Sequence, residues 1–168
     1  GPPGTLSFRR IGRSTNPLTP IHRNRVLVFG DDTRSFLATV RSLGRCGLCV
    51  EAAPEDFRSP ALRSRYVSAV HRLPPVIDDG AGWVAAVEEL LRRRCFDLVI
   101  PCTDRTLLPL ERHRALFETL TRLAVPGRHA MAVFFDKLRT RETAAALRIA
   151  VPPAVVPTGT SRPDEIAA

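Results

Sequence analysis

Lysine is nearly absent from this chain of 168 residues. Of its 25 basic side chains only one, Lys137, is a lysine. A general preference for arginine could leave a single lysine on the surface with no special role. A site that needs a phosphate-binding point charge, however, is served by a compact ammonium on a flexible stem rather than by a planar guanidinium. The scarcity of lysine therefore leaves two interpretations of Lys137, between which its sequence context must decide.

Other absences limit the class of protein. No stretch approaches the roughly 18 consecutive apolar residues of a membrane-spanning helix, so we expect no membrane partner. Aromatic residues make up 6% of the sequence and hydrophobic residues 44%. A hydrophobic share near one half is typical of a globular protein, and the length suits one ordinary domain with some chain left over.

The net charge of +8 is unevenly distributed. Residues 1–25 hold five arginines and no acid, whereas the remaining 143 residues hold 20 basic and 17 acidic side chains. Because the rest of the chain is nearly neutral, its charge gives little support to a nucleic-acid partner, which we do not expect. Polyanion binding by the basic tail remains an alternative function.

The four cysteines, Cys46, Cys49, Cys95 and Cys102, do not form a metal-binding pattern. The first pair has C-x-x-C spacing, but the second pair is seven residues apart, which is poor for a closed zinc site. We therefore expect buried free thiols, no metal ligands, and a reducing, cytoplasmic location.

Both ends of the sequence look cut. The only methionine is Met131, so residues 1–24 are expected to be an irregular basic tail or the remnant of a protease site rather than a natural start. At the other end, Ser161 and Pro163 are typical of the start of a helix, yet the chain stops after about one turn. An isolated single turn is unstable, so we expect a truncated chain.

Strands and helices alternate along residues 25–156. Continuous apolar runs at 25–30 and 96–101 are typical of strands buried on both faces of a parallel sheet. One helix presents an apolar face made of Trp83, Val84, Val87, Leu90 and Leu91. The other expected strands are 48–52, 67–73, 123–125 and 154–156, and the expected helices are 33–44, 82–95, 109–123, 129–135 and 137–149.

This order predicts a doubly wound α/β fold with a mostly parallel sheet, because the connections are too long for hairpins. We expect a Rossmann-like domain at residues 25–127. Residues 128–168 would then form a helical linker and the start of a following domain.

Candidate substrate-binding residues follow the first and fourth strands of the chain. Ligands of such sheets bind outside the carboxyl ends of the strands, which here carry Gly30, Asp31 and Asp32 and then Cys102, Thr103 and Asp104. Neither loop has a glycine-rich phosphate-binding pattern. The carboxylates could hold an amine-bearing substrate, or they could cap helices.

The segment from Asp136 to Pro152 carries the most specific pattern. Asp136-Lys137 opens a helix that continues through Thr140 and Ala144 to Arg148-Ile149 and then Val151-Pro152. Together with the first and fourth strands, this pattern resembles the N-terminal part of ATP-grasp ligases, the branch similar to carbamoyl-phosphate synthase, biotin carboxylase and amino-acid ligases. The resemblance covers residues 25–168 and is most specific at 134–168. Arg148, where the family prefers glycine, and the additional Ala150 depart from the family pattern.

The resemblance implies a role for each part of the chain. Lys137 would contact the phosphates of ATP held by a C-terminal ATP-grasp domain of the same polypeptide. The whole protein would use ATP and magnesium to join a small carboxylate to an amine, and a homodimer is compatible with the family. The fragment itself would have no catalytic residues and no bound cofactor, and would be inactive alone. A free-standing Rossmann-like ligand-binding or regulatory domain is the alternative, and the sequence does not identify the acid or the amine.

Overall fold

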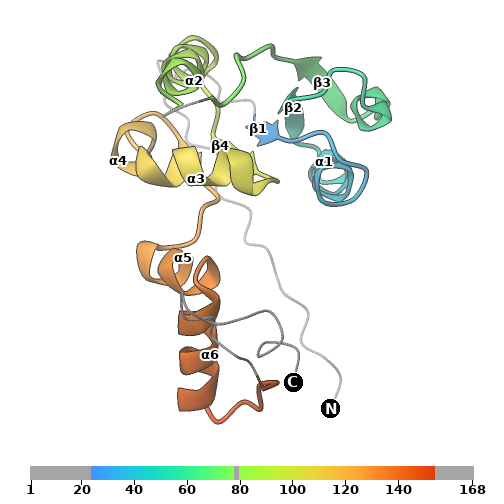
Figure 1. The fold of residues 1–168 in the computed structure, drawn as a ribbon. Helices are drawn as coiled ribbons and strands as arrows, with labels where there is room; N and C mark the ends of the chain where they lie inside the picture. Colours follow the sequence, from blue (N-terminus) through green and yellow to red (C-terminus); the bar gives the residue numbers. More distant parts are fainter. Residues whose placement is uncertain (1–23, 78–79, 154–168) are drawn as a thin grey trace, which may run out of the picture.

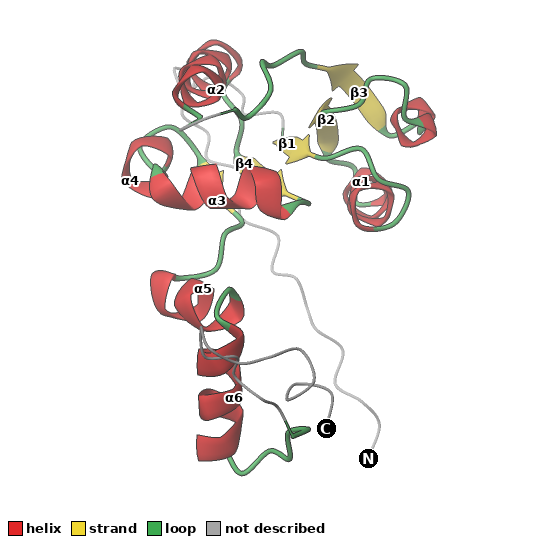
Figure 2. Cartoon of the chain, in the orientation of Figure 1, coloured by secondary structure: helices red, strands yellow, loops and turns green. Residues whose placement is uncertain are grey.

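The computed structural model describes residues 24–77 and 80–153. Figure 1 shows two parts: a sheet with helices on both faces, and below it a pair of helices, α5 and α6, that extends away from the sheet. Helices α2, α3 and α4 lie on one side of the sheet and α1 lies on the other, as the colouring by secondary structure in Figure 2 also shows.

All strands of the sheet are parallel. Their order is β3-β2-β1-β4-β5, so the chain moves outward from β1 to β3 and then crosses to the opposite side of β1. This arrangement confirms the predicted doubly wound α/β fold. The strands are β1 (Arg25–Phe29), β2 (Cys49–Ala53), β3 (Val67–Val70), β4 (Leu98–Pro101) and β5 (Arg122–Leu123).

The helices that flank and follow the sheet are short. In the described ranges they are α1 (Ser35–Arg45), α2 (Ala81–Arg94), α3 (Asp104–Arg112), α4 (Arg114–Phe117), α5 (Arg128–Phe134) and α6 (Lys137–Ala146), with a 3₁₀ turn at Pro60–Arg63. The five residues predicted to form the apolar face of α2 are all buried, which confirms that face.

Each face of β1 contributes to a different core. Val26 and Val28 pack with α1, whereas Leu27 and Phe29 pack with the helices on the other side. Alternate side chains of a strand point to opposite faces, so a strand covered on both sides is usually apolar along its whole length. This double burial explains the continuous apolar run that predicted the strand.

The helix predicted from Pro109 to about residue 123 is wrong at its start and is interrupted. Helix α3 begins at Asp104 and contains Pro109, and His113 separates α3 from α4. The first turn of α3 forms before Pro109, because the carbonyl of Thr103 accepts hydrogen bonds from the N–H groups of Thr106 and Leu107 at 3.2 and 2.9 Å. The proline therefore lies within an already formed helix and does not start it.

The end of α6 differs from the predicted end at residue 149. The helix ends at Ala146, and Arg148 adopts a left-handed conformation with φ of 58°. The N–H of Arg148 donates to the carbonyl of Ala145 and the N–H of Ile149 to that of Ala144, both at 2.9 Å. This pair of bonds is a Schellman motif, in which glycine usually takes the left-handed position. Arg148 thus adopts the left-handed conformation that glycine most often takes at this position of the motif.

The predicted burial of all four thiols is wrong. The cysteines are free, but Cys46 and Cys95 are exposed, and Cys49 and Cys102 are partly buried. Cys46 directly follows α1 and Cys95 directly follows α2, so both lie at surface turns. The predicted strand at 154–156 and the helix start near Ser161 lie outside the described residues.

Candidate functional site at the carboxyl ends of the strands

The structure brings the two predicted loops together. Strands β1 and β4 are neighbours, and the N–H of Cys102 donates to the carbonyl of Phe29 at 2.9 Å. On the other side of β1, the N–H of Gly30 donates to the carbonyl of Ala53 at 3.3 Å. The loops after β1, β2 and β4 therefore form one continuous edge, the position where ligands of doubly wound sheets bind.

Gly30 permits the close approach of the first and fourth loops. Its φ is 135°, and a Cβ placed on it would lie 3.1 Å from the Cβ of Cys102. A side chain would therefore be strained by its backbone conformation and crowded by Cys102. Burial raises the pKa of the Cys102 thiol, so this residue is a protonated packing group and not a thiolate.

Asp31 joins the loop after β1 to the loop after β2. Its carboxylate accepts hydrogen bonds from the backbone N–H groups of Glu55 and Asp56, at 2.9 and 2.6 Å. The hydroxyl of Ser59 donates to its carbonyl oxygen. Asp31 is thus a positioning residue for Glu55, the first charged side chain after β2.

Asp32 makes the hydrogen bonds of a helix cap. Its carboxylate accepts from the N–H of Arg34 at 2.7 Å, the hydroxyl of Ser35 at 2.7 Å and the N–H of Phe36 at 3.0 Å. Desolvation raises the pKa of Asp32, but the hydrogen bonds from Ser35, Phe36 and Arg34 together outweigh it, so the pKa is lowered. The geometry favours the capping interpretation, because these donors already occupy the carboxylate.

The loop after β4 leads directly into α3. Thr103 precedes the helix, and its hydroxyl lies 3.1 Å from that of Thr106. Asp104 is the first residue of α3 and is exposed. Of the six residues predicted to bind substrate, Asp104 therefore has the most solvent-accessible carboxylate at this edge.

A cavity of about 410 Å³ lies at the same edge. It is lined by the ends of β1 and β2, by the segment after β3, and by the first turns of α2 and α3. Aromatic rings and prolines make up much of its wall, and charged residues lie at its rim. The lining includes Phe29, Ala53, Glu55, Phe57, Trp83 and Arg105.

None of the residues lining this cavity was among the predicted site residues. The same rule that selected the loops after β1 and β4 applies to the ends of β2 and β3, where Glu55 and Phe57 follow a strand. This rule could not identify Trp83, since helical periodicity predicted only that it lies on the apolar face of its helix. The sequence would have indicated Glu55 and Phe57 if the ends of all the predicted strands had been considered, not only the two that are followed by acidic loops.

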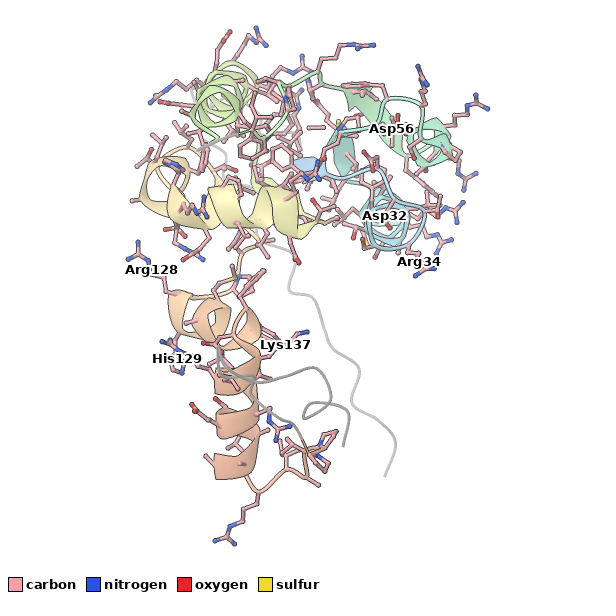
Figure 3. All side chains as sticks on the ribbon, in the orientation of Figure 1. Asp32, Arg34, Asp56, Arg128, His129 and Lys137 are labelled. Atoms are coloured by element: carbon pink, nitrogen blue, oxygen red, sulfur yellow. The ribbon has the colours of Figure 1, made fainter. Side chains whose placement is uncertain are left out.

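Lys137 lies away from this edge. It is the first residue of α6, it is exposed, and within residues 24–77 and 80–153 it has no ion-pair partner. Figure 3 shows it on the helical pair, apart from Asp32 and Asp56 at the sheet. The carboxylate of Asp136 accepts from the N–H groups of Leu138 and Arg139, so the start of α6 is already capped. Among the described residues the lysine ammonium has no ion-pair partner at this helix start, so it can contact an anion.

Two further properties of the described residues bear on function. In residues 24–77 and 80–153, no three or more His, Cys, Asp or Glu side chains are placed to hold a metal ion. Within the same ranges, no helix has the length and apolar character needed to cross a bilayer.

Comparison with solved structures finds the same fold in carboxylases. The chain is similar to the biotin carboxylase domain of a single-chain bacterial carboxylase, with a TM-score of 0.57 and 18% identity over 81% of the chain. It is also similar to the biotin carboxylase subunit of pyruvate carboxylase, with a TM-score of 0.56 and 16% identity over 79% of the chain. A glycinamide-RNase-transformylase T from Mycobacterium tuberculosis gives a TM-score of 0.50 and 22% identity over 78% of the chain.

These neighbours are much longer than the chain. It spans 31%, 29% and 37% of their respective lengths. No protein-family model matches the sequence, and no curated protein matches it. The comparisons thus confirm, as a likeness of fold, the resemblance to biotin carboxylase drawn from the sequence.

Proposed function

We propose that this chain is the N-terminal substrate-binding domain of an ATP-grasp ligase that joins a carboxylate to an amine. The observation that carries the proposal is the shared fold with biotin carboxylase domains, of which the chain spans about a third. The pattern from Asp136 to Pro152 supports it independently, because these residues resemble the corresponding segment of this family. Fold by itself does not fix function, so the proposal rests on both observations together.

Lys137 is assigned to the phosphates of ATP. Its ammonium is exposed at the start of α6 and pairs with no described carboxylate. Such a group can act as a point charge on a phosphate held by a neighbouring domain. The scarcity of lysine agrees with this role, since arginine fills nearly every other basic position.

The loops at the carboxyl ends of β1 and β4 are assigned to substrate. Gly30, Asp31, Asp32 and Cys102 hold the loops in place, as their hydrogen bonds and contacts indicate. Thr103 and Asp104 then face the substrate at the start of α3. The exposed carboxylate of Asp104 adds negative charge at this edge, which favours the approach of an amine-bearing substrate.

ATP would supply the phosphoryl group that activates the carboxylate, with magnesium shielding its charge. The amine then displaces phosphate to form the amide. As the resemblance implies, we assign the magnesium ligands to the following ATP-grasp domain. The chain alone is therefore expected not to turn over. The proposed setting is the cytosol, in keeping with four free thiols, and a homodimer remains a prediction.

The nucleotide role is tested with Lys137→Ala in the full-length protein. We expect the kcat/KM for ATP to fall by about tenfold or more, the effect of losing a charge-assisted hydrogen bond. Lys137→Arg should recover only part of the activity, because a planar fork does not replace a point charge. Arg112→Ala, an exposed residue of α3, is the control. Normal ATP-dependent turnover by Lys137→Ala would show that the assignment is wrong.

A further inference from the structure

We infer that the cavity at the carboxyl ends of β1 and β2 binds a free α-amino acid with an apolar side chain. The role of this ligand as the amine component rests on the proposed function, whereas its binding rests on the cavity alone. Three features of the cavity support this ligand: its apolar wall, its charged rim and the backbone that holds the rim in place.

The inner wall of the cavity is apolar and buried. Phe29, Ala53 and Trp83 line it with exposures of only 1%, 3% and 4%, so the apolar surface that a ligand can reach comes from the partly buried Phe57, Leu73 and Val76. The rings of Phe29 and Trp83 lie with their centroids 5.2 Å apart and their planes tilted by 49°. This packing fixes both rings, so the wall is formed before a ligand arrives. A volume of about 410 Å³ with such a lining is suited to a small apolar group.

The rim carries one positive and one negative group. Arg105 Nη1 lies 2.9 Å from Glu55 Oε2, and the two side chains are 67% and 38% exposed. An ion pair this exposed contributes about 0–1 kcal/mol, so exchanging it for a ligand costs little. The ammonium and carboxylate of an α-amino acid are attached to the same carbon. Such a ligand can therefore offer its carboxylate to Arg105 and its ammonium to Glu55 while its side chain enters the cavity.

Both charged residues are attached to well-fixed backbone. The N–H of Glu55 is bound by the carboxylate of Asp31 at 2.9 Å. Arg105 lies in the first turn of α3 beside Thr106, which is 2% exposed and donates its hydroxyl to the carbonyl of Thr103. The positions from which the two side chains reach the rim are thus set by the same loops that form the edge of the sheet.

Ligands with only one of the two charges fit less well. A simple carboxylate would pair with Arg105 but face the carboxylate of Glu55, and a simple amine would face the guanidinium of Arg105. A peptide separates its terminal charges, so it cannot satisfy two groups that lie side by side. An α-amino acid meets both charges at once, and a polar side chain would lose contacts with the wall that an apolar one makes.

Trp83 is the only tryptophan of the chain and lines the cavity, so its fluorescence reports binding at this place. The chain is titrated with L-leucine, L-leucinamide, 4-methylpentanoate and L-serine, with calorimetry as the second readout. We expect saturable binding of L-leucine, about tenfold tighter than that of each of the other three ligands, which corresponds to about 1.4 kcal/mol. Absence of saturable L-leucine binding at millimolar concentration, or equal affinity for all four, would overturn the inference.

Two substitutions assign the charges. Arg105→Gln should weaken L-leucine binding about tenfold and bring it close to that of L-leucinamide, and Glu55→Gln should do the same relative to 4-methylpentanoate. Arg112→Gln and Glu89→Gln, both exposed and not among the residues lining the cavity, are the matched controls. Thermal unfolding checks that each variant is folded. Unchanged L-leucine affinity in both rim variants would contradict the proposed binding mode.

The test of amino-acid binding can be distinguished from the test of the nucleotide role of Lys137. Lys137→Ala should leave L-leucine binding unchanged, because the lysine does not line the cavity. Leucine binding together with normal ATP turnover in Lys137→Ala would support the amino-acid site and contradict the assigned nucleotide contact. Loss of ATP turnover in Lys137→Ala together with no leucine binding would support the nucleotide contact and contradict the amino-acid site.

Discussion

The sheet with its helices and the α5–α6 pair are stabilised in different ways. The sheet has apolar cores on both faces, with side chains such as Phe36 and Phe117 completely buried. In the pair, Met131 of α5 is buried in one of these two cores, whereas α6 buries no side chain within the described part of the chain. Phe134 and Leu147 are 73% and 67% exposed.

Local hydrogen bonds dominate in the helical pair. Asp136 caps α6, the hydroxyl of Thr140 donates to the carbonyl of Val133 at 2.6 Å, and Arg148 closes the other end. Helices of this length are marginal in water without packing. The difference implies that the sheet forms the stable unit, and that the pair carrying Lys137 opens at lower free energy.

The largest effect expected from this comparison concerns two phenylalanines. Phe36 is completely buried between α1 and the sheet, so Phe36→Ala should lower the free energy of unfolding by about 4 kcal/mol through lost burial and a cavity. Phe134→Ala, the matched change at a 73% exposed side chain, should alter it by less than about 0.5 kcal/mol. Urea unfolding followed by circular dichroism measures both. Equal losses would mean that α5 belongs to the same cooperative core as the sheet.

A buried carboxylate distinguishes the sheet further. Glu51 of β2 is 2% exposed, and its oxygens lie 3.1 and 3.2 Å from Arg94 Nη2 and 2.5 Å from His71 Nε2. Arg25 Nε is 3.2 Å away but lacks the alignment of a hydrogen bond, so we assign it a purely electrostatic contribution. This cluster links β1, β2, the segment after β3, and the end of α2.

Removing the charge of Glu51 is expected to have the next largest effect. Glu51→Gln leaves two arginines without a carboxylate, which should cost about 3 kcal/mol, the lower end for a buried pair because Arg94 is partly exposed. Glu89→Gln breaks an exposed pair with Arg93 and should cost less than about 0.5 kcal/mol. Thermal unfolding of the two variants at one pH provides the measurement. A loss below 1 kcal/mol for Glu51→Gln would mean that the arginines reach water instead.

The sheet could be predicted because its signals are local. Doubly buried strands are usually continuous apolar runs, as around Leu27 and Val28, and the face of α2 follows from helical periodicity. The start of α3 could not be predicted, since Pro109 is a stronger signal of a helix start than Asp104. The exposure of Cys46 and Cys95 was missed because it depends on where each helix ends.

Of the residues at the carboxyl edge of the sheet, the sequence predicted only those in the two loops that carry acidic side chains after a strand. The acidic loop after β1 and the loop after β4 do meet, because parallel strands place their ends at one edge. The sequence could not show that Asp31 and Asp32 use their carboxylates within the protein. It also could not show that Glu55 and Arg105, fifty residues apart, form an ion pair across the rim of a cavity.

The smallest effect is expected from removing a helix cap, either Asp32 at α1 beside the sheet or Asp136 at α6 of the helical pair. Asp32→Ala should lower the free energy of unfolding by about 1 kcal/mol, the value of a lost helix cap. Because the folded-state pKa of Asp32 lies below its ordinary value of 3.8, this contribution is fully present above that value and disappears as the pH falls through the folded-state pKa.

The stability gap between Asp32→Ala and the unaltered protein should therefore be constant from pH 7 to about 5 and shrink at lower pH, as followed by urea unfolding. Asp136→Ala removes the corresponding cap of α6. It should leave global unfolding nearly unchanged and speed hydrogen exchange in α6 alone, because that helix opens separately. If Asp136→Ala instead lowered global stability as much as Asp32→Ala, the helical pair would unfold together with the sheet and the two parts would be one cooperative unit.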